Sequence, residues 1–287
     1  MAKTIDNSNE VLIVCALMPE AKPIIAEYKL HFECGEYGFK LYRGGRALKK
    51  TDLEMEHGDI FLLVTGVAKV NMAAAMMWVR QYCQFESVIN IGVAGHASLS
   101  IGDVVLINKV IDDDSGKAFY PSINFRWRGQ QSALKTVSQS TDEYSVEYAF
   151  DMEASAFFEI ANRCVTTDKI HILKVISDNA DNPYQELTAQ NLQAGVVLLL
   201  DPLKALLKLV LSADTPEYRL TELLKVMTEK WHLTATREIQ LKEILHAIIV
   251  MEENTCNKGP DWQSYRSVTT YLQDCREWLK SVKPKIN

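Results

Sequence analysis

Three carboxylates stand where acid–base chemistry is possible. Glu20 follows the apolar run "VLIVCAL", Glu153 lies in "DMEASA", and Asp178 follows another apolar run in "VISDNAD". Each has an ordinary alternative explanation, because acids are favoured at helix starts and Asp is common in turns. A carboxyl group with a raised pKa can donate a proton, and an ionised one can activate water or oppose a developing cation. Together the three groups are candidates for one reactive site.

The elements that must position them come from the apolar pattern. Short runs rich in Val and Ile predict buried strands at 11–17, 59–67, 87–93, 103–111 and 169–177, and helical patterns occupy 19–28, 70–82 and 153–164. Such alternation predicts a mixed or largely parallel sheet covered by helices. Ligands of these sheets bind at the carboxyl ends of the strands, where the three acids stand.

The last quarter of the chain shows helical periodicity alone. Three amphipathic faces recur at a period of 3.6 residues, formed by Leu220, Leu223, Leu224, Met227 and Trp231; by Leu241, Ile244, Leu245 and Ile248; and by Tyr265, Val268, Leu272, Cys275 and Leu279. The polar stretch "SADTPEY" suits a linker or a helix start. We therefore expect an α/β domain over 1–213 and a small all-helical extension over 214–287.

Composition narrows the class of protein. The chain has 287 residues, 47% of them hydrophobic, and a formal net charge of −6, which gives no general attraction to nucleic acid or to an anionic membrane. The run "AGVVLLLDPLKALLKLVL" predicts a buried helix broken near Asp201, since Pro202 and charges interrupt it. The N-terminus lacks a secretory signal and the six cysteines lack metal-binding spacing. We expect a cytoplasmic protein with reduced thiols, no metal and no cofactor.

Five ordered motifs carry a resemblance to a known family. The motifs "CALMPEA", "TGVAKVNMAAA", "NIGVAGHASLSIGDVV", "DMEASA" and "VISDNAD" together resemble the nucleoside phosphorylase and nucleosidase superfamily, nearest to its methylthioadenosine and adenosylhomocysteine nucleosidase branch. The match covers about residues 11–211. It implies a three-layer α/β/α domain with a mixed central sheet that cleaves the N-glycosidic bond of a purine nucleoside, and a homodimer.

The resemblance also implies roles for individual residues. Asp178 would be the general acid that protonates the leaving base, Glu153 would bind the ribose hydroxyls, and Glu20 would position the attacking water. Met152 would pack against the sugar, and Lys174 stands where the branch usually has Arg. The remaining substrate-binding positions implied by the motifs are Thr65, Val93, Ala94, Gly95 and Ser177.

The choice between water and phosphate as the nucleophile stays open. The turn "ALMPE" lacks the glycines of a phosphate cradle, and Glu20 would repel phosphate, so hydrolysis is favoured. Arg43 and Arg46 in "LYRGGRALKK" are an alternative phosphate site, although two arginines beside a Gly-Gly turn more often belong to a solvated hairpin. A phosphorylase and a non-catalytic nucleoside-binding protein on the same fold are the two alternatives.

The chain departs from the family pattern in two places. Only about forty residues separate Asp112 from Asp151, where the nucleosidase branch is longer and walls the base. Ser138, Gln139 and Ser140 of "TVSQSTDE" offer donors and acceptors as a substitute for that wall. The stretch "FYPSINFRWRG" (119–129) is a lid over the site, a surface loop or an interface element. The helical extension is the second departure, and its role stays open.

Overall fold

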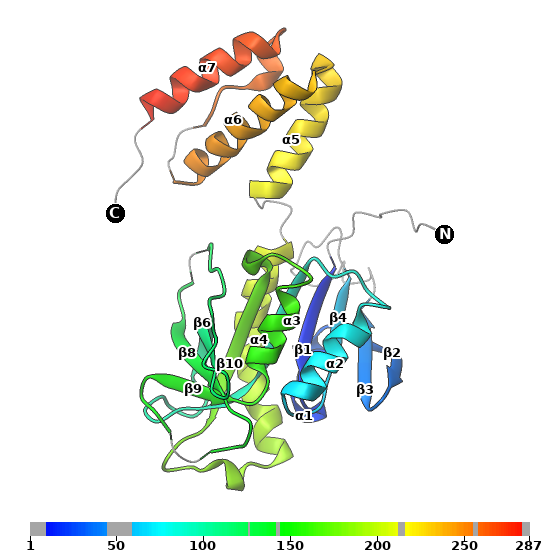
Figure 1. The fold of residues 1–287 in the computed structure, drawn as a ribbon, viewed down its shortest axis with the longest axis vertical. Coiled ribbons are helices and arrows are strands. Elements are labelled where there is room, and N and C mark those ends of the chain that lie inside the picture. Colours follow the sequence, from blue (N-terminus) through cyan, green and yellow to red (C-terminus); the bar gives the residue numbers. More distant parts are fainter. Residues whose placement is uncertain are drawn as a thin grey trace. The chain divides into compact units, whose positions relative to one another are not determined.

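A computed structural model describes residues 10–44, 59–125, 127–141, 144–211, 216–254 and 258–282 (Figure 1). The chain divides into two compact units, Met1–Leu211 and Ser212–Asn287. The domain boundary that we predicted from the sequence, after residue 213, lies outside the described residues and stays a prediction.

The first unit contains a sheet of ten strands in the described part of the chain. They are β1 (Val11–Cys15), β2 (His31–Glu36), β3 (Phe39–Gly44), β4 (Ile60–Val64), β5 (Ser87–Gly95), β6 (Val104–Asp112), β7 (Ala118–Phe119), β8 (Gln130–Thr136), β9 (Tyr148–Asp151) and β10 (Ile170–Asp178). The pairing order is β10-β6-β8-β9-β5-β1-β4-β3-β2, and β7 pairs with β6.

Two features of this sheet place the functional residues. Strands β4, β1, β5 and β10 are mutually parallel, so their carboxyl ends share one edge. Strand β10 pairs with both β5 and β6, and β9 pairs with both β8 and β5. The strands β5, β10, β6, β8 and β9 therefore close into a ring, with β1, β4, β3 and β2 extending from it as an open sheet.

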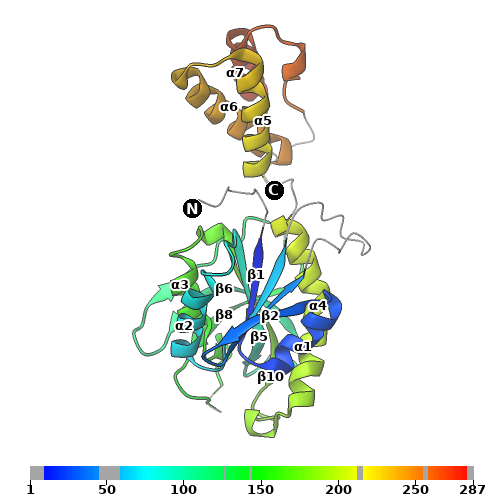
Figure 2. The same cartoon turned by 90° about the vertical axis from the view of Figure 1, so that its right-hand side faces the viewer.

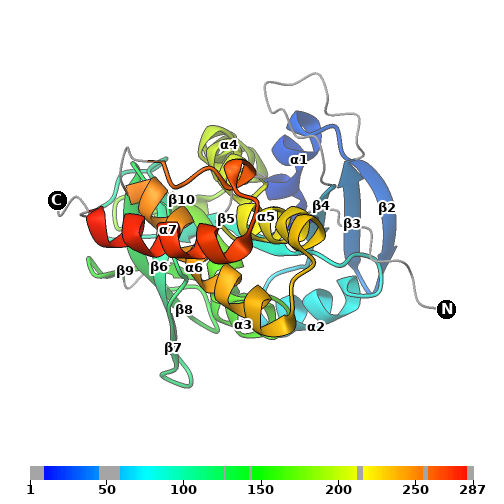
Figure 3. The same ribbon diagram turned by 90° about the horizontal axis from the view of Figure 1, so that it is seen from above.

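Helices cover both faces of the sheet, as Figures 2 and 3 show. On one face lie α1 (Met18–Glu27) and α4 (Ala189–Leu211), and on the other lie α2 (Lys69–Val79) and α3 (Ala154–Ala161). Because side chains alternate along a strand, Leu12 and Val14 of β1 join the α2–α3 core, whereas Val11, Ile13 and Cys15 join the α1–α4 core. The predicted three-layer α/β/α fold with a mixed sheet is confirmed.

The second unit is a three-helix bundle formed by α5 (Pro216–Trp231), α6 (Ala235–Asn254) and α7 (Val268–Ser281). All the residues of the three predicted apolar faces belong to its core or pack against it, which confirms the helical periodicity. In neither unit does the described part of the chain contain a helix that is long and apolar enough to cross a membrane.

The structure corrects two details of the predicted elements. Strands β2, β3, β7, β8 and β9 were not predicted, because their alternating or short patterns lack a continuous apolar run. The predicted break near Asp201 is wrong, since α4 continues through Pro202. Proline removes one helical hydrogen bond to the carbonyl of Leu198, which is 52% exposed, while Leu199, Leu203 and other residues of the buried face hold the helix on the sheet.

Core packing on the α3 face generates a stability prediction. Phe157 is fully buried in the α2–α3 core. We expect Phe157→Ala to lower the free energy of unfolding by about 3–5 kcal/mol, because it loses apolar burial and leaves a cavity. The exposed Val70 on α2 provides the control, and Val70→Ala should change stability by about 0.5 kcal/mol or less. Urea unfolding measures both, and a loss below about 1 kcal/mol for Phe157→Ala would contradict the packing.

Candidate active site

A cavity of about 250 Å³ opens at the carboxyl ends of the parallel strands. It is smaller than a typical drug-sized pocket and matches a compact ligand. All three candidate carboxylates line it, and so do most of the predicted substrate-binding residues, namely Met152, Val93, Ala94, Gly95, Lys174 and Ser140. The fold therefore gathers groups from five separate segments of the sequence.

Glu20 is held by backbone groups in the first turn of α1. Its Oε2 accepts hydrogen bonds from the N–H groups of Leu17 at 2.8 Å and Ala16 at 3.0 Å, and Oε1 accepts one from Val93 at 3.3 Å. A Cβ atom on Gly92 would lie 2.9 Å from Oε1, so only glycine leaves room for this carboxylate. The glycine in "NIGVAGH" thus makes space for an acid as well as for a ligand.

Glu153 occupies the N-cap position of α3 rather than its first turn. Its Oε1 accepts a hydrogen bond at 2.8 Å from the N–H of Ala68, the residue that precedes α2. Ala68 has φ of 90°, in the left-handed region that side-chain-bearing residues rarely adopt. Such conformations persist only where surrounding structure holds them, so the chain maintains strain at the point where it binds Glu153.

Lys174 and Asp151 form a buried ion pair on the cavity wall. The Nζ of Lys174 lies 3.0 Å from Oδ2 of Asp151, and their side chains are 3% and 1% exposed. Oδ1 of Asp151 accepts a hydrogen bond from the Thr136 hydroxyl at 2.8 Å, and both of its oxygens accept from the N–H of Ala154. Asp151 therefore orients the ammonium group and also holds the start of α3.

Burial sets the protonation of this cluster. Desolvation raises the pKa of Glu20, although backbone hydrogen bonds and Lys174 oppose the rise. Burial and the neighbouring charge of Asp151 raise the pKa of Glu153 to about 7. Burial disfavours the charged form of Lys174, but Asp151, Glu153 and Glu20 outweigh this and raise its pKa. Lys174 is thus a permanent cation among acids, at least one of which titrates near neutral pH.

Asp178 is the last residue of β10 and is held by two hydroxyl groups. Tyr144 donates to Oδ2 at 2.7 Å, and Ser177 donates to Oδ1 at 2.5 Å. A Cβ on Gly95 would lie 2.6 Å from Oδ2 of Asp178 and from the ring of Tyr144, so this glycine also leaves room for an acid. The two hydroxyl groups therefore fix both oxygens of the Asp178 carboxyl group.

The other predicted site residues lie elsewhere. The Thr65 hydroxyl donates to backbone carbonyls of Gly66 and Cys15, and Thr65 does not line the cavity. Gln139 does not line the cavity either. Arg43 pairs with Asp59 and lies opposite Phe61, near the amino end of β4, whereas the cavity lies at the carboxyl ends. The structure thus separates Arg43 from the cavity; Arg46 lies outside the described residues.

The stretch 119–129 does not form a lid in its described part. Ile123, Phe125 and Trp127 pack against the α1–α4 core, and the Phe125 ring meets His171 edge to face. Its described residues are absent from the cavity lining. Packing on the core explains Phe125 and Trp127, whereas Tyr120 is exposed and lies under the ammonium group of Lys109.

Sequence reasoning missed Asp151 and Tyr144. Asp151 stands two residues before Glu153 in the sequence, and this spacing was the only sign of a second acid at the site. The pairing of Asp151 with Lys174 becomes visible only in the structure. Tyr144 lies in a polar segment without periodicity, and nothing in the sequence relates it to Asp178. Both residues enter the site through the closure of the ring of strands by β9.

Comparison with known proteins agrees with this geometry. A family model described as the phosphorylase superfamily matches residues 10–143. No curated protein sequence matches the chain. Among solved structures, the apo 5′-methylthioadenosine nucleosidase of Arabidopsis thaliana is 19% identical, with a TM-score of 0.58 over 71% of this chain and 96% of that one.

Two bacterial structures give the same result. A mutant nucleosidase of Helicobacter pylori with 5′-methylthioadenosine in its active site is 15% identical, with a TM-score of 0.57 over 70% of this chain and 99% of that one. The 5′-methylthioadenosine/S-adenosylhomocysteine nucleosidase of Streptococcus pneumoniae, with a transition-state inhibitor, is 17% identical, with a TM-score of 0.55 over 69% and 98%. These likenesses confirm the nucleoside phosphorylase-like fold that the motifs imply.

The raised pKa of Glu153 generates a prediction about stability. An acid with a higher pKa in the folded state destabilises the fold progressively as pH rises from its unfolded value, about 4.5, through about 7. We expect Glu153→Gln to be neutral at low pH and stabilising above pH 7, by up to a few kcal/mol at about 1.4 kcal/mol per unit of pKa shift.

Urea unfolding between pH 5 and 8.5, followed by NMR signals of amides in the first unit, measures this difference. Glu159→Gln, on the partly exposed face of α3, is the matched control and should show no pH-dependent gain. A stability difference between wild type and Glu153→Gln that is flat with pH would contradict a raised pKa.

Proposed function

We propose that this chain is an enzyme that hydrolyses the N-glycosidic bond of a purine nucleoside. The observation that carries the proposal is the meeting of Glu20, Glu153 and Asp178 in one buried cavity at the carboxyl edge of a nucleoside phosphorylase-like fold. A protein that only binds nucleosides needs hydrogen-bond donors and an apolar slot. It does not need several acids held against their tendency to be solvated.

The charge balance of the cavity suits this reaction. Asp151, Glu153 and Glu20 surround a single ammonium group, that of Lys174, so the ionised cluster has excess negative charge. Breaking the bond between C1′ and the base leaves a sugar with oxocarbenium character. Fixed negative charge in a water-poor cavity stabilises such a cation more than it stabilises the neutral substrate.

In this proposal Asp178 is the general acid. The electron pair of the C1′–N bond goes to the base, and the Asp178 carboxyl group transfers its proton to a ring nitrogen, so that a neutral base leaves. Ser177 and Tyr144 fix the carboxyl group from both oxygens. Glu153, held by Ala68, accepts hydrogen bonds from the ribose hydroxyls and places its charge beneath the ring.

Glu20 completes the reaction by activating water. Its three backbone hydrogen bonds fix its orientation, and its raised pKa makes it a stronger base than an exposed Glu. Water attacks C1′ as the cation develops, and Glu20 takes the proton that the water loses. Free base and free sugar leave, and the two carboxyl groups have exchanged one proton each with the reactants.

The cavity favours water over phosphate as the nucleophile. Within the described residues the only cationic side chain in its lining is Lys174, which is already paired with Asp151. A phosphate dianion beside Glu20 would be repelled, and Arg43 is committed to Asp59. The named substrates of the structural neighbours make 5′-methylthioadenosine and S-adenosylhomocysteine the first compounds to test. The homodimer expected from the resemblance stays a prediction.

A panel of nucleosides with and without phosphate tests the reaction. We expect base release from adenosine-type nucleosides, 5′-methylthioadenosine included, at the same rate in the presence and absence of phosphate. Chromatography of the free base and assay of the free or phosphorylated sugar distinguish the two reactions. Release that requires phosphate, with a sugar phosphate as product, would replace the nucleosidase by a phosphorylase.

The acid is tested by Asp178→Asn. We expect kcat to fall by at least about a hundredfold, the usual contribution of a general acid, while calorimetry shows nucleoside affinity within a few fold of wild type. Asp181→Asn, an exposed residue three positions later, is the control and should leave kcat unchanged. Turnover by Asp178→Asn equal to wild type would remove Asp178 from the mechanism, and binding without turnover in wild type would leave a nucleoside sensor.

A further inference from the structure

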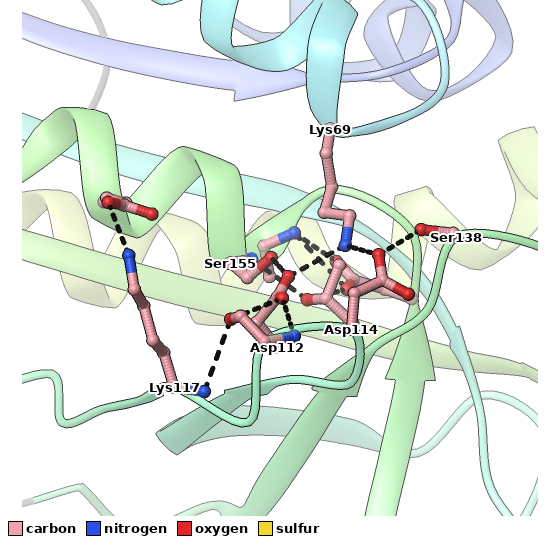
Figure 4. Close-up of polar contacts among 11 residues, drawn as sticks. Lys69, Asp112, Asp114, Lys117, Ser138 and Ser155 are labelled. Carbon is pink, nitrogen blue, oxygen red and sulfur yellow. Dashed lines mark hydrogen bonds and ion pairs between the residues drawn. The ribbon is translucent and has the colours of Figure 1, made fainter.

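A polar cluster lies just outside the cavity wall, where Lys69 inserts between two aspartates (Figure 4). Lys69 is the first residue of α2, Asp112 is the last residue of β6, and Asp114 follows in the next turn. The Nζ of Lys69 lies 2.9 Å from Oδ2 of Asp112 and also pairs with Asp114. The Lys69 side chain is 21% exposed and that of Asp112 is 13% exposed, so the pair is shielded from solvent.

Hydroxyl groups extend this cluster to two further segments. Ser155 of α3 donates to Oδ2 of Asp112 at 2.7 Å, and Ser115 donates to Oδ1 through its N–H and its hydroxyl. Ser138, just beyond β8, donates to Oδ2 of Asp114 at 2.5 Å. The Lys69 cluster (Lys69, Asp112, Asp114, Ser138 and Ser155) therefore ties α2, α3, β6 and the β8–β9 segment to one another.

Each of these ties ends close to a cavity group. Ala68, adjacent to Lys69, donates the hydrogen bond that holds Glu153, and its positive φ requires support from its surroundings. Ser138 is next to Val137 and two residues before Ser140, both of which line the cavity. A displacement of Lys69 would therefore reach the ribose-facing carboxylate through one neighbour and the cavity wall through another.

We propose that Lys69 is a positioning residue for the reaction, which keeps the Ala68 N–H on Glu153 and keeps the 137–141 segment in the cavity wall. The inference rests on the proposed function for its catalytic consequence. Its structural part, the hold on Glu153, is independent of any turnover. Lys69 itself is absent from the cavity lining and acts through its neighbours.

The charges around Glu153 make the effect of a change at Lys69 measurable as a change in the pKa of Glu153. Glu153 is faced by Asp151 from β9, Lys174 from β10, Glu20 from α1 and the Ala68 N–H at the start of α2. Burial, Asp151 and Glu20 raise the pKa of Glu153, whereas Lys174 and the Ala68 hydrogen bond lower it. Weakening the Ala68 contact therefore raises the pKa of Glu153 further, and the ionised form is lost at a higher pH.

The Lys69 cluster is built to hold its charges. Burial opposes ionisation of Asp112, but hydrogen bonds from Lys69, Ser155 and Ser115 outweigh it and hold the pKa of Asp112 far below its usual range. Burial likewise opposes the charge on Lys69, while hydrogen bonds to Asp114 and Asp112 outweigh it and raise the Lys69 pKa. The cluster stays charged across the working range of pH, so its own titration does not complicate the measurement.

The test compares Lys69→Met with Lys117→Met. Met keeps most of the side-chain length and removes the charge. Lys117 is a matched control, because it lies in the same region, as Figure 4 shows, and pairs with Glu159 on the solvent side of α3. The titration of Glu153 is followed by ¹³C NMR of the Glu carboxyl signals, assigned through Glu153→Gln, and Ala68 amide exchange is measured on the same proteins.

We expect the Glu153 midpoint to rise by about one pH unit in Lys69→Met, the size expected for loss of one hydrogen bond to a charged group, and the Ala68 amide to exchange faster. Lys117→Met should match wild type in both. If wild type cleaves nucleosides, the low-pH limb of kcat/KM should move by the same amount. An unmoved Glu153 midpoint and Ala68 amide in folded Lys69→Met would overturn the proposal, whatever the activity.

Two further variants test separately the hold on Glu153 and the tie to the 137–141 segment, and they serve as a second test if Lys69→Met does not fold. Ser138→Ala removes only the tie to the 137–141 segment, so we expect KM to rise several fold with the pH limb unmoved. Asp114→Asn, with a side chain 57% exposed, weakens the hold on Lys69 without stranding a buried charge and should shift the Glu153 midpoint in the same direction. A KM for Ser138→Ala equal to that of wild type would contradict the tie to the 137–141 segment. An unshifted Glu153 midpoint in Asp114→Asn would contradict the hold on Glu153. If the wild-type protein releases no base but the Glu153 midpoint still shifts in Lys69→Met, the proposed nucleosidase activity is contradicted and the hold of Lys69 on Glu153 is supported.

Discussion

The buried ion pair between Lys174 and Asp151 is the interaction on which the rest of the site depends. Two glutamates lie close enough to raise the pKa of Lys174, and all four groups are almost fully buried. Burying an unpaired charge costs several kcal/mol, so neither glutamate could remain ionised there without a cation in the centre. The ion pair alone is neutral, which leaves the two glutamates to supply the excess negative charge. A single ammonium group thereby makes an acid-rich cavity possible, although its one positive charge does not balance all of the negative charges around it.

The topology explains how this pair is assembled. Lys174 lies in the middle of β10 and Asp151 at the end of β9, and both strands pair with β5. Closing the ring through β9 brings Asp151 beside Lys174, and the absence of side chains at Gly92 and Gly95 leaves room for Glu20 and Asp178 against the same strand. Three acids and a lysine therefore converge on β5, which contributes no charged side chain itself. Strand β5 therefore contributes a backbone N–H group for Glu20 and, at its two glycines, the room that Glu20 and Asp178 occupy.

The sequence predicts the parts of this arrangement that follow from local pattern. Continuous apolar runs identify β1, β4, β5, β6 and β10, and the motifs identify Glu20, Glu153, Lys174 and Asp178 as neighbours of the cavity. It does not predict Asp151 or Tyr144, because their contacts arise from non-local pairing of short strands that carry weak periodicity. Likewise, Pro202 predicts a helix break that burial of the α4 face overrides. Arg43 illustrates the converse, since its chemistry suits phosphate but its strand register directs it to the opposite edge of the sheet.

The site also divides into groups held by regular structure and groups held by a few polar contacts. Glu20 lies in the first turn of a helix, Lys174 and Asp178 in a central strand, and Glu153 at a helix N-cap, so their geometry is fixed by backbone hydrogen bonds. The wall formed by Val137, Ser140 and Thr141 is instead irregular, and near it Ser138 donates a hydrogen bond to Asp114 and Tyr144 donates one to Asp178. Irregular segments of this kind tolerate changes of composition better than the strands and helices that they connect. The acids and the lysine of the cavity are therefore held by regular secondary structure, whereas part of the cavity wall comes from an irregular segment, in which changes of sequence cost the fold least.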